Sequence, residues 1–456
     1  MKKQQSQTYE PVDASPVKSF FVSMLTRDIS LEEAILDLLD NCVDGILRSA
    51  PSEDDKKPYQ DYRAELTFNG DSFTITDNCG GIPWKLHDYA FRMGRPKERP
   101  DESPGSVGVY GIGMKRAMFK MGRHCLVSTQ NGKERYEVEI DPGWIADEEQ
   151  WAIPVKEATK TKKKDGTTIV IGELYPEIAS RFSEELESFK ADLERMIAAH
   201  YAFIINKGFE VLVNGSVVRP RPTKLVFSKG GKGTHGIKPY IFKTTTPEGV
   251  SVFVAVGFAR PMPTQEEIEG EKEETRYSSV EAGWTILCND RAVLYCDRTE
   301  LTGWGEAGVP RYHNQFIAIS GVVEFRCDDA RKLPMTTTKR GIESSSRLYL
   351  QIKNKMREGM RIFIDYTNKW KGSTEESKKH IEGEVAIPFN EVKIASKKLV
   401  FRSTKRTIPS GEQYRPNLPL PKKIESNQRR ISFVRDEGKV KRVAQYLYDD
   451  VEADPS

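Results

Sequence analysis

The stretch ILDLLDNCVDGI at residues 35–46 has two contrasting faces when it is wound as an α-helix. At about 100° per residue its apolar side chains form one broad stripe, which predicts a helix packed against a core. The opposite face is polar and acidic and collects Asp37, Asp40, Asn41, Asp44 and, one turn earlier, Glu33. A solvated face usually mixes charges or carries Glu–Lys pairs one turn apart, and here no cation accompanies the carboxylates. The acidic face therefore needs an explanation other than solvation.

The composition predicts a soluble, cytoplasmic chain of more than one domain. At 456 residues the chain is too long for one ordinary core, so we expect about two or three domains. No apolar run is long enough to span a membrane, and the N-terminus lacks the apolar segment of a secretory signal. The six cysteines include no CxxC pair, which indicates reduced thiols and excludes a disulfide framework.

Positive charge is concentrated near the C-terminus. Residues 392–442 contain fifteen Lys and Arg against four Asp and Glu, although the net charge of the whole chain is only +3. Such a segment predicts either an arm that binds DNA or another polyanion, or a solvated tail packed on an acidic domain. Binding to DNA would place the protein at the nucleoid or chromatin.

Patterns of strands and helices divide the chain. RAELTFNGDSFTITDN (63–78) alternates polar and apolar residues around Asn69-Gly70, which predicts a β-hairpin that brings Asp77 to a strand end. Residues 91–106 are charged and rich in proline and glycine, as in a long functional loop. A single helical pattern covers residues 183–205. Further on, four strand-like segments precede a helix at roughly 344–364, so the second half is also α+β.

Three segments after the acidic helix have the chemistry of a nucleotide site. A carboxylate at a strand end, such as Asp77, can accept an amino hydrogen from adenine, and the nearby Gly81 lets the base approach the backbone. A strand entered through glycine carries Thr167. Backbone N–H groups of a glycine-rich loop at a helix N-terminus bind phosphates. That loop consists of Gly108, Val109, Tyr110, Gly111, Ile112, Gly113, Met114 and Lys115.

Together with the acidic helix, these segments resemble the four boxes of the GHKL or Bergerat-fold ATPases. That family includes gyrase B, the ninety-kilodalton heat-shock chaperones, histidine kinases, MutL and the microrchidia (MORC) proteins. Its E-x-x-D/x-N box is matched by Asp37-Leu-Leu-Asp40-Asn41, and its D-x-G-x-G box by Asp77-Asn-Cys-Gly-Gly81. The resemblance implies that ATP and Mg²⁺ bind here. Asp37 would activate water, Asn41 would be the metal ligand, Asp77 and Thr167 would recognise adenine, and the loop 108–115 would wrap the phosphates.

The resemblance continues into the second half of the chain. LPMTTTKRGIE (333–343) is similar to the loop by which the transducer domains of gyrase, MutL and MORC proteins place a lysine on the γ-phosphate. The residue carried over is Lys339, and the alternative is an ordinary surface lysine. The resemblance covers roughly residues 20–365.

Two residues depart from the family pattern. Cys79 replaces the first glycine of the second box. Asp37 replaces the usual glutamate and is shorter by one methylene, or about 1.5 Å, so hydrolysis is expected to be slow. Glu33, one turn away, is an alternative base.

We therefore expect an α+β chain of three parts. A Bergerat-fold α/β sandwich at residues 1–205 precedes an S5-like α/β transducer domain at 206–370 and a basic arm or small helical extension at 371–456. The expected function is an ATP-hydrolysing conformational switch that dimerises on ATP and acts on DNA or a protein partner. The alternatives are a scaffold that binds ATP without hydrolysis and a chaperone-like ATPase. A histidine kinase is disfavoured because no histidine precedes the first box.

Overall fold

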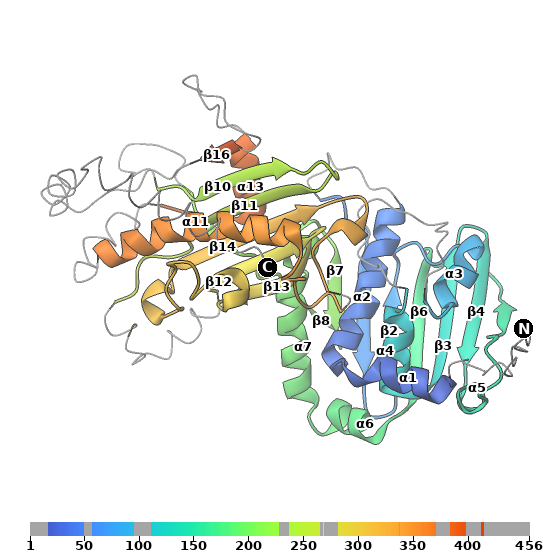
Figure 1. The fold of residues 1–456 in the computed structure, drawn as a ribbon. Coiled ribbons are helices and arrows are strands. Elements are labelled where there is room, and N and C mark those ends of the chain that lie inside the picture. Colours follow the sequence, from blue (N-terminus) through green and yellow to red (C-terminus); the bar gives the residue numbers. More distant parts are fainter. Residues whose placement is uncertain are drawn as a thin grey trace, which may run out of the picture.

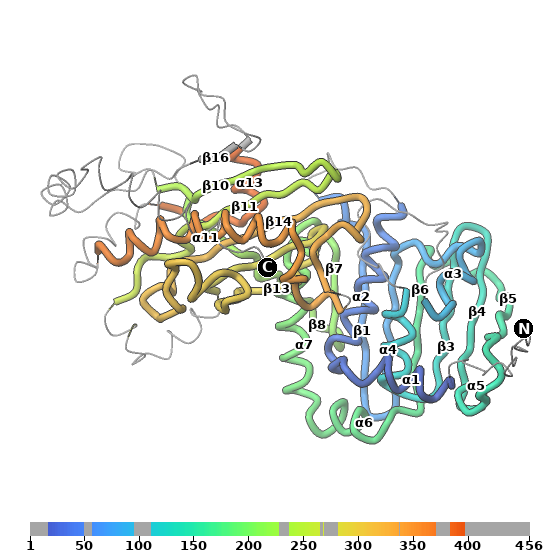
Figure 2. The backbone as a smooth tube through the Cα atoms, viewed as in Figure 1, coloured from blue at the N-terminus to red at the C-terminus, as the bar shows by residue number. Residues whose placement is uncertain are grey.

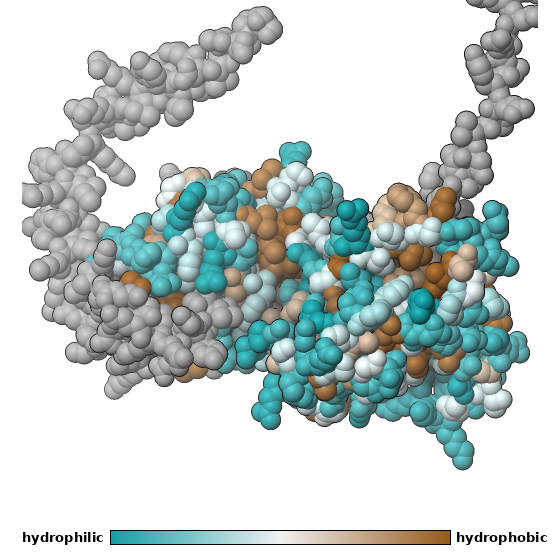
Figure 3. Space-filling view, turned by 90° about the horizontal axis from the view of Figure 1, so that it is seen from below, coloured by the Kyte–Doolittle hydropathy of each residue, from teal (hydrophilic) through white to brown (hydrophobic). Residues whose placement is uncertain are grey.

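The computed structural model describes residues 17–49, 57–94, 111–227, 237–264, 268, 281–336, 338–370, 384–397 and 412–414. They form two α+β parts that lie side by side (Figure 1). This confirms the expected α+β class. The face in Figure 3 is largely hydrophilic with scattered apolar side chains. Among the described residues, no helix has both the length and the apolarity needed to cross a membrane.

The first part is built on an eight-stranded sheet with the order β5-β4-β3-β6-β2-β1-β7-β8. Its pairs are antiparallel except for the parallel pair of β1 and β7. The strands are β1 (Arg63–Phe68), β2 (Phe73–Asp77), β3 (Gly122–Asn131), β4 (Glu134–Ile140), β5 (Val155–Glu157), β6 (Gly166–Leu174), β7 (Glu210–Val213) and β8 (Ser216–Val217). Strands β7 and β8 belong to this sheet although they follow residue 205, where we expected the first domain to end.

The hairpin predicted around Asn69-Gly70 is formed by β1 and β2. Their register pairs Ala64 with Asp77 and Phe68 with Phe73, so Asp77 is the last residue of β2. The antiparallel pairing of β2 with β6 then brings Thr168 opposite Thr76. These two pairings place Asp77 beside the start of β6.

Helices cover the core face of this sheet (Figure 2). The acidic stretch lies in α2, which begins with a capping box in which Ser30 and Glu33 bond each other's backbone N–H groups. The helical pattern at 183–205 is not one helix, because it is divided among α6, α7 and α8. The helices are α1 (Lys18–Arg27), α2 (Leu31–Arg48), α3 (His87–Phe91), α4 (Gly113–Met121), α5 (Pro142–Ala146), α6 (Pro176–Ser183), α7 (Leu186–His200) and α8 (Ala202–Asn206).

The second part is a six-stranded sheet with the order β13-β12-β14-β11-β10-β16. Helix α11 (Arg347–Lys369) packs along it through the buried side chains of Met356, Met360 and Phe363. The strands are β10 (Tyr240–Thr245), β11 (Ser251–Phe258), β12 (Gly283–Cys288), β13 (Arg291–Asp297), β14 (Ile319–Arg326) and β16 (Glu412–Tyr414).

Part of the expected C-terminal extension packs on this second sheet. Strand β15 (Ala386–Pro388) pairs with β9 (Lys224–Val226), and α13 (Phe389–Lys397) follows it directly. Phe389 and Val392 are buried in a cluster that also contains Phe203 of the first part. The described portion of residues 371–456 is therefore anchored to the body of the molecule.

The two parts contact each other directly where α7 and α8 meet β13. His200 Nδ1 lies 2.6 Å from the carbonyl oxygen of Ala292, and Lys207 Nζ lies 2.5 Å from Asp290 Oδ2. Burial, followed by repulsion from Arg291 and Arg340, lowers the pKa of His200 to about 3. His200 is therefore neutral at pH 7 and donates its Nδ1 hydrogen to Ala292.

Candidate active site

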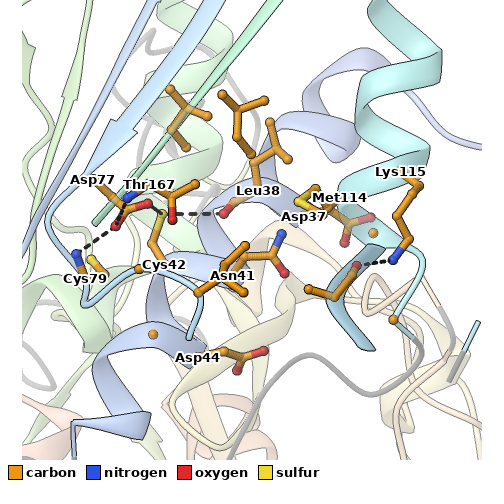
Figure 4. Close-up of a pocket in the computed structure, with 18 of the residues that line it drawn as sticks. Asp37, Leu38, Asn41, Cys42, Asp44, Asp77, Cys79, Met114, Lys115 and Thr167 are labelled. Atoms are coloured by element: carbon orange, nitrogen blue, oxygen red, sulfur yellow. Dashed lines mark hydrogen bonds between the residues drawn. The ribbon is translucent and has the colours of Figure 1, made fainter. Parts of the chain in front are cut away.

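A pocket of about 1130 Å³, including its open mouth, lies between α2, the end of β2 and the start of α4 (Figure 4). The predicted site residues that line it are Asp37, Asn41, Asp77, Gly81, Gly111, Ile112, Gly113, Met114, Lys115, Thr167 and Lys339. The remaining predicted residues, Gly108, Val109 and Tyr110, lie outside the described residues.

Asp77 is fixed at one end of the pocket by backbone hydrogen bonds. Its Oδ1 accepts from the N–H of Cys79 at 2.7 Å and from the N–H of Thr167 at 3.4 Å. Burial raises the pKa of Asp77 to about 6, although these two hydrogen bonds oppose the rise. The result is an oriented carboxylate that is ionised at pH 7 and can accept one further hydrogen bond from a ligand.

The glycine of the second box is required by close backbone packing. Gly81 has φ +66°, and a Cβ at this position would overlap the carbonyl oxygen of Gln130. Cys79, which departs from the family pattern, is buried with its thiol near the carbonyl oxygen of Arg63, and its backbone N–H orients Asp77. A cysteine at position 79 therefore still provides the backbone N–H that orients Asp77.

The polar face of α2 forms another wall of the pocket. Asp37, Asp40 and Asp44 are buried, whereas Asn41 is exposed and lines the pocket. The amide oxygen of Asn41 is a hard, uncharged ligand of the type that Mg²⁺ accepts. No group of three or more His, Cys, Asp or Glu side chains in the described residues could bind a metal ion. A Mg²⁺ ion at Asn41 would thus need oxygen ligands from phosphate and water, which fits an ion that enters with a nucleotide.

Arginines from two other segments pair with Asp37 and Asp40 on this face. Arg116 of α4 donates from Nε at 3.2 Å and from Nη2 to Asp37 Oδ2. Arg291 of β13 donates from Nε to Asp40 Oδ1 at 2.9 Å, and the Tyr201 hydroxyl donates to the same oxygen at 2.5 Å. Asp37 and Asp40 are therefore members of buried ion pairs.

Lys339 comes from the second part and completes this charge cluster. Its Nζ lies 2.9 Å from Asp40 Oδ2 and 3.7 Å from Asp37 Oδ1, and the residue is only 6% exposed. The alternative of an ordinary surface lysine is therefore wrong. Burial alone would lower the pKa of Lys339, but the surrounding aspartates outweigh it and raise the pKa.

The same ion pairs act on Asp40. Burial alone would raise the pKa of Asp40, but Lys339, Arg291 and the hydrogen bond from Tyr201 hold it below the usual value. Asp40 is therefore a permanent anion that joins the two parts of the molecule.

The loop that carries Lys339 is shaped to present it. Met335 and Ile342 form a β-bridge, and the N–H of Thr336 donates to the carbonyl oxygen of Gly341 at 3.1 Å. Lys339 has φ +57°, a conformation that costs a residue with a Cβ about 1–2 kcal/mol. Backbone strain of this kind is often found at functional sites.

Two residues differ from the sequence expectation. Glu33 bonds the backbone N–H of Ser30 at 3.1 Å and does not line the pocket, so its position does not favour it as the alternative base. Lys115 lines the pocket, but its Nζ donates to the carbonyl oxygen of Ala90 at 2.7 Å. This contact ties the start of α4 to α3.

The sequence analysis missed Arg116, Arg291 and Tyr201. Arg116 directly follows the predicted Lys115, so its position one turn into the phosphate-loop helix was a usable signal. Nothing local marks Arg291 or Tyr201, because their partner Asp40 is distant in sequence.

Comparison with known proteins agrees with this geometry. Residues 29–168 match the family described as histidine kinase-, DNA gyrase B- and HSP90-like ATPases. No curated protein matches the chain. The matched residues include α2, the end of β2, the start of α4 and the start of β6, which supply the pocket. Residues 29–168 therefore belong to a GHKL-type ATPase domain, which implies that the protein is an ATP hydrolase.

Proposed function

We propose that this protein is an ATP-driven conformational switch in which the second part acts as an S5-like transducer domain. The observation that carries the proposal is the position of Lys339. It belongs to the second part, yet its ammonium group lies inside the pocket of the ATPase domain, between Asp37 and Asp40. A γ-phosphate bound beside these residues would contact both parts of the molecule at once.

The proposed hydrolysis uses Asp37 as the general base. A water oxygen forms a bond to the γ-phosphorus while the bond from that phosphorus to the bridging oxygen breaks, and the electron pair leaves on ADP. Asp37 takes a proton from the attacking water and releases it to solvent, so the products are ADP and phosphate. Mg²⁺ bound at Asn41 would supply positive charge to the β- and γ-phosphates. Asp77 and Thr167 would bind adenine, and the loop 108–115 would bind the phosphates.

Coupling follows from the one group that distinguishes ATP from ADP. A ligand shifts a conformational equilibrium only through contacts that differ between the two states. The γ-phosphate offers Lys339 an anion that ADP lacks. We therefore expect ATP to bring the transducer and the ATPase domain into a fixed arrangement that favours a homodimer, and ADP to leave monomers or a looser dimer.

The test is the ATPase rate and the mass by light scattering of wild type and Lys339→Ala, each with ADP and with a non-hydrolysable ATP analogue. We expect the variant to bind nucleotide nearly normally, to hydrolyse slowly and to dimerise poorly. Lys332→Ala is a matched control, because Lys332 is an exposed lysine of the second part whose side-chain Nζ donates to the carbonyl oxygen of Glu248, away from the pocket. A mass that is indifferent to nucleotide would contradict the proposal. Nucleotide-dependent mass without turnover would favour the non-hydrolysing scaffold.

We further propose that the basic residues in 392–442 bind DNA through its phosphates. Most of that segment lies outside the described residues. Lys393 lies within them, and its Nζ pairs with Glu324, so we exclude it from the expected contacts. The affinity for duplex DNA should fall by about 0.9 log units per neutralised phosphate for each log unit of salt. A chain ending at residue 371 that binds DNA as tightly as the full chain would contradict this proposal.

A further inference from the structure

The start of helix α4 lies close to Asp37, and both line the pocket. A Cβ placed on Gly113, the first residue of α4, would lie 3.2 Å from Asp37 Cγ and 3.3 Å from Asp37 Oδ2. The N-terminal N–H groups of α4 and the carboxylate of Asp37 therefore border the same small volume. A phosphate bound at this helix end would lie next to the proposed base.

Arg116 occupies the boundary of that volume. It lies one turn after Gly113, is only 7% exposed and lines the pocket. Its two described side-chain hydrogen bonds use Nε and Nη2, and both go to Asp37 Oδ2. A guanidinium has five N–H donors in a planar fork, so one edge can bind a carboxylate while another edge donates to a second anion.

We propose that Arg116 binds the γ-phosphate and links it to Asp37, as an arginine supplied by the ATPase domain itself. The inference rests on the proposed function and assigns this residue a part in the same site. Arg116 then has two effects. It holds the carboxylate of the base Asp37 in place, and its positive charge stabilises the charge that develops on the γ-phosphoryl oxygens during hydrolysis.

The shorter base is compatible with this assignment. Asp37 is one methylene shorter than the glutamate of the family pattern, and the guanidinium of Arg116 contacts its carboxylate from the side of α4. Lys339 approaches the other oxygen, Oδ1. The two cations therefore lie near different oxygens of Asp37. Because Arg116 belongs to α4 and Lys339 to the second part, they would contact a bound γ-phosphate from different elements.

The experiment compares Arg116→Ala and Arg116→Lys with wild type. The affinities for ADP and for a non-hydrolysable ATP analogue are measured by calorimetry, and kcat and KM by ATP turnover. We expect Arg116→Ala to bind ADP within about twofold of wild type and the analogue about tenfold more weakly, because a charged hydrogen bond is lost only with the analogue. Its kcat should fall about 10³-fold, as for other arginines that contact a transferred phosphoryl group.

Two further measurements separate binding of the phosphate from a purely structural role. Added guanidinium should restore part of the kcat of Arg116→Ala, and Arg116→Lys should retain charge without the planar fork and give an intermediate kcat. Lys120→Ala is the matched control. Lys120 is a cation of the same helix that bonds the carbonyl oxygen of Thr26 at 3.1 Å and does not line the pocket. Its kcat should equal that of wild type.

The outcomes decide between the two roles. If Arg116→Ala weakens the affinity for ADP and the affinity for the analogue by the same factor, or keeps the wild-type kcat, the proposal is wrong. If Arg116→Ala does not fold, Arg116→Lys is used for the same test. A ratio of the affinities for the analogue and for ADP that equals the wild-type ratio in that variant would overturn the proposal. Failure of wild type to bind ATP refutes the proposed function instead. If wild type binds ATP but does not turn it over, the affinity ratio still tests Arg116.

Discussion

The two ends of the pocket are built in different ways. At the proposed adenine end, Asp77 is oriented by backbone N–H groups of Cys79 and Thr167, all within the ATPase domain. At the proposed phosphate end, Asp37 and Asp40 are surrounded by cations from α4 and from the second part. One end therefore depends on local backbone geometry, and the other depends on the arrangement of two domains.

This difference separates binding from coupling. Changes at the adenine end should alter nucleotide affinity while the domain arrangement stays the same. Changes at the phosphate end should alter hydrolysis, stability or the domain arrangement while much of the affinity remains. The following predictions test that separation.

The largest effect is expected for Asp37→Asn. Because an amide cannot accept the proton of the attacking water, kcat should fall by about 10²- to 10⁴-fold, while the affinity for ATP changes little. An ATP turnover assay measures kcat, and calorimetric titration measures the affinity for ATP. Near-wild-type hydrolysis in Asp37→Asn, with loss in Glu33→Gln, would assign the base to Glu33 and show that the phosphate end is misassigned.

The next effect concerns stability. Arg291→Met should lower the free energy of unfolding by about 3–5 kcal/mol, because it leaves the buried Asp40 without one of its cations. Asp40→Asn should also lower the free energy of unfolding, because Arg291 and Lys339 then lose the buried anion that they share. Urea unfolding measures both. Arg311→Met is the control, because the Arg311 side chain is 87% exposed and its ion pair with Glu300 lies at the surface. Equal losses in the two arginine variants would contradict the interdomain role.

A third prediction uses the raised pKa of Asp77. The ionised carboxylate is a stronger hydrogen-bond acceptor than the protonated carboxyl, so ATP affinity should fall as pH drops through about 6, by up to about tenfold per pH unit. The stability of the protein without ligand should change in the opposite direction. A carboxyl whose folded-state pKa lies above its unfolded value stabilises the fold as pH falls from about 6 towards 4. Asp77→Asn should remove both dependences, and a persisting pH dependence of affinity would place the titrating group elsewhere.

The smallest effect is expected at the domain contact. His200 has a pKa of about 3 in the folded protein, well below that of an unfolded histidine, so the unfolded chain binds the proton more readily. Stability should therefore decrease as pH falls below about 6.5, by about 1 kcal/mol between pH 7 and pH 5.5. Urea unfolding of wild type and His200→Gln at both pH values tests this. The free energy of unfolding of His200→Gln should fall by about 1 kcal/mol less than that of wild type between the two pH values. An equal decrease in both proteins would show that His200 is not the titrating group.

Local patterns predicted well the strands that carry Asp77 and Thr167. The alternation around Asn69-Gly70 predicted the hairpin of β1 and β2 with Asp77 at a strand end, and the glycine at 166 begins β6 as expected. The pattern at 183–205 failed because tertiary contacts interrupt it. Tyr201 separates α7 from α8, and its hydroxyl bonds Asp40 and the carbonyl oxygen of Leu36.

The phosphate end could be predicted only in part. The periodicity of α2 identified which side chains share a face, and the family resemblance pointed to Lys339. Neither could reveal that Arg116 and Arg291 neutralise that face, because helical periodicity carries no information about contacts between distant segments. The ion pairs between different helices and strands therefore could not be predicted from the sequence.

The ion pairs of Asp40 also bear on how the chain folds. Its partners Arg291 and Lys339 lie 251 and 299 residues further along. During synthesis the ATPase domain emerges long before either cation, so its central helix must carry an unpaired carboxylate until the second part is complete. Contacts of such long range are slow to form, since a large loop must close before they contribute. A fragment that ends with the ATPase domain therefore lacks the cations that pair with Asp40. ATP turnover should begin only after the second part has been synthesised and has folded.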